Sequence, residues 1–130
     1  RGWVNCGLCP LCKREQETGP HLFFKCRYTL RLWRSIIEKL GLPHVNIPDW
    51  HLDESVKEWW VKRTDDRNPN WHAMSSLVML TSWTIWNERN ARVFRQKFAP
   101  PPILLQTIIG EAKLWVTAGA KKLGTIIVCE

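Results

Sequence analysis

The sequence predicts a mainly α-helical protein in which a small, loop-rich head precedes a body of about four helices. Turn-forming glycines and prolines, together with closely spaced cysteines, fill the first 26 residues. Apolar residues then recur at helical spacing along much of the chain. Nine tryptophans among 130 residues supply enough apolar area for a core at this length. We therefore divide the chain into a head with its first helix, residues 1–42, and a helical tail, residues 43–130.

The first helix is predicted over residues 29–40. Its apolar residues fall on one helical stripe, at Leu30, Trp33, Ile37 and Leu40. Gly41 stands where a left-handed C-terminal cap belongs, and Pro43 prevents the helix from continuing.

Three further helices are expected after a connection over residues 43–52. Asp53 is the predicted N-cap of a short helix that runs to about Arg63. A long helix over residues 70–95 is apolar around most of its circumference in its first half, so it is expected to be central. The proline triplet at residues 100–102 should end that helix and form a stiff link. The last helix is predicted over residues 103–123, before a β-branched tail over residues 125–129.

A cysteine–histidine cluster in the head has the spacing of a metal site, Cys9-x2-Cys12-x8-His21-x4-Cys26. A tight turn brings two thiolates that are two residues apart to the same side, and the histidine and last cysteine supply the other corners of a tetrahedron. Thiolate and imidazole ligands select zinc over magnesium or calcium. Because protein ligands fill all four positions, the predicted Zn²⁺ is structural rather than catalytic.

Cys6 leaves an alternative open, because Cys6-x2-Cys9 is an equally good clamp. We prefer Cys9 and Cys12, since Pro10 and Leu11 between them suit a knuckle turn. Cys6 is then a spare thiol or a substitute ligand, and the remote Cys129 is expected to be unrelated.

The basic residues indicate a polyanionic partner. The formal net charge is +7, with a pI near 9.5. Three arginines share one face of the first helix, and further bases and two aromatic rings lie nearby in the head. The predicted nucleic-acid-binding residues are Lys13, Arg14, Phe23, Phe24, Lys25, Arg27, Arg31 and Arg34. The alternative is that the arginines only face water and that Phe23 or Phe24 seals the core of the knuckle.

A second basic face comprises Arg89, Arg92 and Arg95, where Glu88 can pair with Arg92 one helical turn away. We interpret this face as a solvated surface. The tryptophans Trp59, Trp71, Trp83, Trp86 and Trp115 are expected to be core residues rather than a ligand cage.

The head resembles a known family. The run Cys9-Pro-Leu-Cys12, then Glu17-Thr18, then His21-Leu-Phe-Phe-Lys-Cys26, then Trp33, is similar to the zinc-binding domain that follows reverse transcriptase in plant LINE-type retrotransposons. The stretches over residues 83–94 and 111–115 resemble the helical tail of such proteins. The resemblance implies the same four zinc ligands and a role in handling RNA or DNA beside the polymerase. It also implies the upstream reverse transcriptase region as a partner.

We accordingly expect a non-catalytic, zinc-stabilised nucleic-acid-binding module, with neither a membrane nor a small molecule as partner. Two adjacent acids at Asp65 and Asp66 lack the other residues of a polymerase motif and fit a solvated turn. No apolar signal segment follows Arg1, so an intracellular location, nuclear or cytoplasmic and not secreted, is expected. The alternatives are a zinc-stapled protein-interaction module, or a degenerate remnant without selected function.

Overall fold

The fold was described from a computed structural model that covers residues 7–42, 45–67 and 71–117. In chain order the elements are a π-helix η1 (His21–Lys25), α1 (Arg27–Leu40), a 3₁₀-helix η2 (Ile47–Leu52), α2 (Val56–Arg63), α3 (Trp71–Phe94) and α4 (Pro101–Thr117). The described residues form no strand, and their one isolated β-bridge joins Leu8 to Gln16. The prediction of a mainly helical protein with an N-terminal cysteine–histidine head is confirmed.

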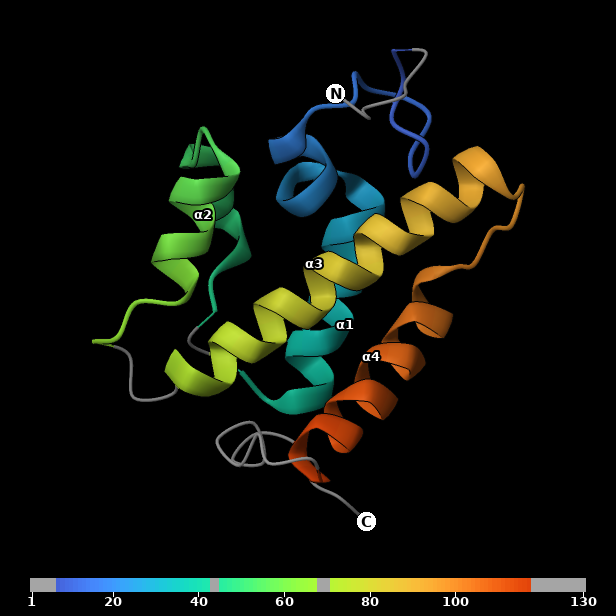
Figure 1. The fold of residues 1–130 in the computed structure, drawn as a ribbon. Coiled ribbons are helices and arrows are strands. Elements are labelled where there is room, and N and C mark those ends of the chain that lie inside the picture. The colour runs from blue at the N-terminus through green and yellow to red at the C-terminus, as the bar shows by residue number, and fades with distance from the viewer. Residues whose placement is uncertain (1–6, 43–44, 68–70, 118–130) are drawn as a thin grey trace.

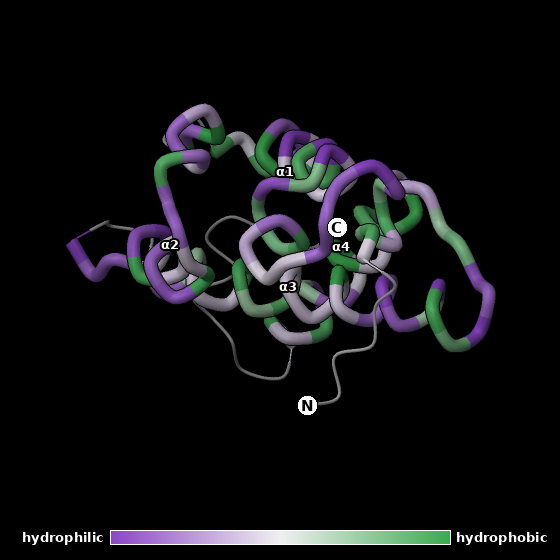
Figure 2. The backbone as a smooth tube through the Cα atoms, turned by 90° about the horizontal axis from the view of Figure 1, so that it is seen from above, coloured by the Kyte–Doolittle hydropathy of each residue, from purple (hydrophilic) through white to green (hydrophobic). Residues whose placement is uncertain are grey.

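Helix α1 begins two residues before its predicted start and ends at the predicted glycine. Gly41 has a φ of 62°, and the N–H of Leu42 donates to the carbonyl of Ile37 at 3.1 Å, which is the long hydrogen bond of a Schellman cap. The helix is amphipathic, as the alternation of hydrophilic and hydrophobic turns in Figure 2 shows. Its buried face packs against α4, which leaves the opposite face to solvent.

The connection after α1 contains a short helix that no periodic pattern announced. Within η2, Trp50 is buried and packs edge-to-face against Trp33 of α1 and Trp59 of α2, with ring centroids 5.4 Å and 5.2 Å away. Phe24 of the head stacks on Trp59 at 5.1 Å with parallel rings. These four rings form an aromatic cluster that ties the head to α1, η2 and α2.

Helix α2 is capped by Ser55 and not, as predicted, by Asp53. The Ser55 hydroxyl accepts a hydrogen bond from the N–H of Glu58 at 3.0 Å. Asp53 is instead a buried carboxylate that accepts from Lys62 at 2.6 Å and Arg63 at 3.5 Å. Both acids and hydroxyls make good caps, so the sequence alone did not separate these two neighbours.

Helix α3 runs through the middle of the molecule and is the central helix that the sequence predicted (Figure 1). It contacts α2, α4 and η1, and most of its first half is buried, including Leu77, Val78 and Leu80. The prediction that Trp83 is a core residue is wrong, because this side chain is 57% exposed. Trp59 is fully buried, whereas Trp71, Trp86 and Trp115 are half-buried.

The proline triplet begins α4 rather than ending α3. Helix α3 stops at Phe94, and Pro101 and Pro102 occupy the first turn of α4, where a missing N–H costs nothing. The link is fixed at Ala99, whose N–H donates to Glu88 and whose carbonyl accepts from the Tyr28 hydroxyl. Helix α4 then lies alongside α3 and across α1 (Figure 1). The predicted continuation to residue 123 and the tail over residues 125–129 lie outside the described residues.

Candidate metal centre

The four predicted zinc ligands meet at one point in the head. The ligand atoms of Cys9, Cys12, His21 and Cys26 all lie within 4.8 Å of one another. The Sγ atoms of Cys9 and Cys26 are 3.9 Å apart, and Cys12 Sγ is 3.3 Å from His21 Nε2. Cys6 lies outside the described residues, and these four side chains complete the set of ligands without it.

These separations fit a tetrahedral zinc ion. Zn–S bonds of about 2.3 Å and Zn–N bonds of about 2.0–2.1 Å at tetrahedral angles require S···S separations of about 3.8 Å and S···N separations of about 3.5 Å. Cys9, His21 and Cys26 are buried and Cys12 is half-buried, so the site is also largely shielded from water. Three thiolates and one imidazole around a closed centre are the donor set of a structural zinc ion.

A tight turn presents the first two cysteines. The N–H of Lys13 donates to the carbonyl of Cys9 at 2.8 Å, and the N–H of Cys9 donates to the carbonyl of Glu15 at 2.8 Å. Lys13 closes the turn in the left-handed region, with a φ of 57°. The backbone N–H groups of Leu11 and Cys12 favour the thiolate form of Cys9.

The other two ligands flank the π-helix η1. The N–H of Cys26 donates to the carbonyl of His21 at 2.6 Å, the i to i+5 bond that defines this helix and spans the x4 spacing. Thr18 caps the turn by accepting from the N–H of His21 at 3.1 Å. Cys26 directly precedes α1, so the first N–H groups of that helix, at Tyr28 and Thr29, favour its thiolate form.

Without the ion, the four ligands share their protons unevenly. The hydrogen bond with Cys26 is the main reason that the pKa of Cys9 falls to about 4, and the same contact, together with burial, raises the pKa of Cys26 above its ordinary value. The Cys9 sulfur also raises the pKa of His21 to about 9. Zinc binding therefore displaces protons from His21 and Cys26 at neutral pH.

Helix α3 holds the head through a buried ion pair. Arg89 donates through Nε to Glu17 Oε2 at 2.8 Å and through Nη2 to Glu17 Oε1 at 3.2 Å. Neither side chain has any exposed surface. Glu17 and Thr18 thus have separate tasks: the glutamate joins the head to α3, and the threonine caps the turn that presents His21.

A second arginine of α3 grips the turn between the first two cysteines. Arg92 donates through Nη1 to the carbonyls of Pro10 and Leu11, both at 3.2 Å. Its Nε donates to Glu88 at 2.8 Å, which confirms the predicted pair, and its Nη2 donates to Ala99 at 3.1 Å. Because Arg89 is buried and Arg92 is half-buried among these acceptors, the interpretation of this face as solvated is wrong for both; only Arg95 is exposed.

The predicted nucleic-acid-binding residues divide into two groups. Five of the basic residues are exposed: Lys13, Arg14, Arg27, Arg31 and Arg34. Lys25 is half-buried, with its ammonium 5.5 Å from the centre of the Phe24 ring. Phe24 is 1% exposed and stacked on Trp59, so the prediction that it offers a free ring face is corrected. Phe23 is half-buried beside Trp86, with ring centroids 6.5 Å apart.

The head is similar to a zinc-binding module of reverse-transcriptase-related proteins. A family profile described as zinc-binding in reverse transcriptase matches residues 1–33, which include all four ligands. No curated protein and no solved structure matches the chain. The comparisons identify a zinc-binding domain and no catalytic domain. Among the described helices, none combines the length and apolarity needed to cross a bilayer.

Proposed function

We propose that the protein is a non-catalytic nucleic-acid-binding module, stapled by zinc and derived from a plant LINE-type retrotransposon polyprotein. The observation that carries this proposal is the exposed face of α1 at Arg27, Arg31 and Arg34. None of these three side chains forms an ion pair with another described residue. Unneutralised guanidinium groups at one-turn intervals suit a row of phosphates.

The zinc centre supports this role by fixing where the basic face stands. Cys26 is both a ligand and the residue before α1, so the ion anchors the beginning of the helix that carries the arginines. Lys13 and Arg14 extend the positive surface from the head. When bound, zinc supplies rigidity alone, because four protein ligands leave no coordination position for a substrate.

The test compares two double variants of equal charge. Arg27→Gln/Arg31→Gln removes two charges from the proposed face, while Lys39→Gln/Lys57→Gln removes two exposed, unpaired charges from elsewhere. Fluorescence anisotropy with single-stranded RNA and DNA should show steep weakening between 50 and 200 mM salt for the unmodified protein. The first variant should lower the salt slope by about 1.5–2 and the second should leave it nearly unchanged. Equal effects of the two variants would reject the α1 face.

A second candidate function rests on an apolar stripe of α3. Met79 is 53% and Trp83 57% exposed, one turn apart, and the half-buried Trp86 continues the stripe. Exposed apolar groups in a row are typical of a protein-interaction surface, and an adjoining reverse transcriptase region is the partner that we propose for it. In that case Trp83→Lys should abolish binding of the isolated reverse transcriptase region, equally at 50 and 200 mM salt. The α1 double variant should then have no effect.

A further inference from the structure

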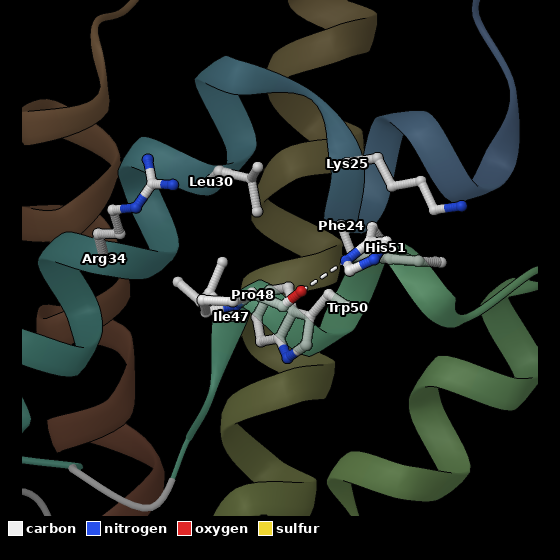
Figure 3. Close-up of a pocket in the computed structure, with 8 residues that line it drawn as sticks. All are labelled: Phe24, Lys25, Leu30, Arg34, Ile47, Pro48, Trp50 and His51. Atoms are coloured by element: carbon white, nitrogen blue, oxygen red, sulfur yellow. Dashed lines mark hydrogen bonds between the residues drawn. The ribbon is translucent and has the colours of Figure 1, made fainter.

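A pocket of about 310 Å³ opens where the head, α1 and η2 meet (Figure 3). Its walls are apolar and come from Phe24, Leu30, Ile47, Pro48 and Trp50. Ligand sites in proteins are mostly apolar clefts of about 300–1,000 Å³ with a few polar groups, so this pocket suits a small flat ligand.

The pocket is preformed. Phe24 and Trp50 are each 1% exposed, and both pack on the fully buried Trp59. Helix η2 is closed by the His51 ring, whose Nδ1 lies 2.6 Å from the carbonyl oxygen of Pro48 (dashed in Figure 3). A carbonyl oxygen only accepts, so Nδ1 carries the proton and the ring is held in one orientation. Little ordering is therefore required when a ligand enters.

Positive charge stands at two ends of this apolar cavity. Arg34 of α1 and Lys25 of η1 line the pocket on opposite sides, with the apolar residues between them (Figure 3). Neither forms an ion pair with another described residue. Leu30 and Arg34 are one turn apart, and Arg27 lies three residues before Leu30, so the pocket borders the basic face of α1.

We propose that this pocket receives the base of one unpaired nucleotide, while Arg34 and Lys25 hold the phosphates on either side of it. The proposal rests on the proposed nucleic-acid-binding function and deepens it. An apolar slot between two cations matches the chemistry of a nucleotide, in which a flat, weakly polar ring lies between two anionic groups. Stacking and apolar contact with a base are tolerant of sequence, so the pocket favours single strands over duplexes without selecting a motif.

The experiment fills the pocket and leaves the charges in place. Leu30→Phe enlarges a half-buried wall residue, and Met79→Phe makes the same kind of enlargement at an exposed position of α3. Binding is measured for oligouridine, oligothymidine and abasic strands of equal length. The unmodified protein should bind base-bearing strands about tenfold more tightly than abasic ones. Leu30→Phe should lower that preference to nearly none with an unchanged salt slope, and Met79→Phe should keep it.

A second variant, Ile47→Phe, narrows the pocket from η2 and should reproduce the loss, so the result does not depend on one substitution. Zinc content and thermal unfolding are checked for each variant. A loss with either RNA or DNA supports the pocket. The proposal is overturned if both variants keep the unmodified preference for bases, or if polyglutamate competes as well as the oligonucleotides. Absence of binding to every strand at 50 mM salt would instead reject the underlying function.

Discussion

Arg89 and Glu17, 72 positions apart in the chain, form a two-point ion pair from which water is excluded on both sides. The fork geometry satisfies both carboxylate oxygens, and Arg89 Nη1 donates in addition to Asn90. A pair of this kind compensates the cost of burying each charge, so its main effect is to fix one arrangement of the head against α3.

Removal of the Arg89 charge should strongly destabilise the protein. Arg89→Met leaves the Glu17 carboxylate buried and unpaired, and we expect the free energy of unfolding of the zinc-loaded protein to fall by about 3–5 kcal/mol. Urea unfolding followed by tryptophan fluorescence measures this change. Arg95→Met, at an exposed position, is the control and should change stability by less than about 0.5 kcal/mol. Glu17→Gln added to Arg89→Met should restore part of the loss; similar losses in Arg89→Met and the control would contradict the account.

The contacts of Arg92 should contribute to zinc affinity. A lysine at this position keeps the charge beside Glu88 but cannot reach both the Pro10 and Leu11 carbonyls with one planar fork. Changes to groups that orient metal ligands typically cost about 10–100-fold in affinity, and we expect Arg92→Lys to lie in this range. Competition with a chromophoric chelator gives the affinity. Arg95→Lys should match the unmodified protein, and an unaltered affinity in Arg92→Lys would exclude a role for these carbonyl contacts.

Chelation of zinc should loosen the head more than the helical body. The amides of Cys9, Lys13 and Glu17 are held only by turn hydrogen bonds around the site, so their hydrogen exchange should accelerate when the metal is removed. Ile108 in α4 is fully buried and remote from the ligands, and its amide should keep much of its protection. Cys12→Ala should give the same pattern without a chelator. Identical exchange with and without zinc would show that the ion has no structural role.

Zinc binding should release protons and strengthen as the pH rises. At pH 7 the metal-free protein carries a proton on His21, whose pKa is about 9, and on Cys26, whose pKa is raised, whereas Cys9, with a pKa of about 4, is already ionised. Zinc must displace these protons, so about two or more should leave per ion, and affinity should rise from pH 6 to 8. Calorimetry in buffers of different ionisation enthalpy counts them. His72→Gln, at an exposed position, should leave the count unchanged. An affinity that is flat with pH would refute the expectation.

The parts of the fold that the sequence predicted are those specified by local chemistry. Ligand spacing identified the four zinc-binding residues, because two-residue and four-residue intervals leave few other geometries. Helical periodicity located α1 and α3 to within a few residues, and the left-handed glycine marked the end of α1. Trp50 was missed because η2 is too short to show a period, and its burial depends on Trp33 and Trp59 from other elements.

The errors arose where a partner far away in the sequence decides the environment. Arg89 and Arg92 were interpreted as solvated because charged residues on a helix usually are; their acceptors, at Glu17 and at Pro10 and Leu11, become neighbours only after the chain folds. Phe24 was offered to a ligand because the sequence does not reveal that Trp59 already covers it. One signal was available: Arg89 and Arg92, three residues apart, lie on the same face of α3 as Glu88 and Ile85, which are buried.

The two guanidinium forks of α3 have a consequence for engineering. Residues 7–26 carry every zinc ligand, yet the acceptors that face Arg89 and Arg92 belong to this same short stretch. A transplant of the head alone into another scaffold would leave a carboxylate and two carbonyls without their donors. A graft that includes the turn of α3 from Glu88 to Arg92 would bring those donors along, so this helix has to travel with the zinc site if the cassette is to keep its native posture.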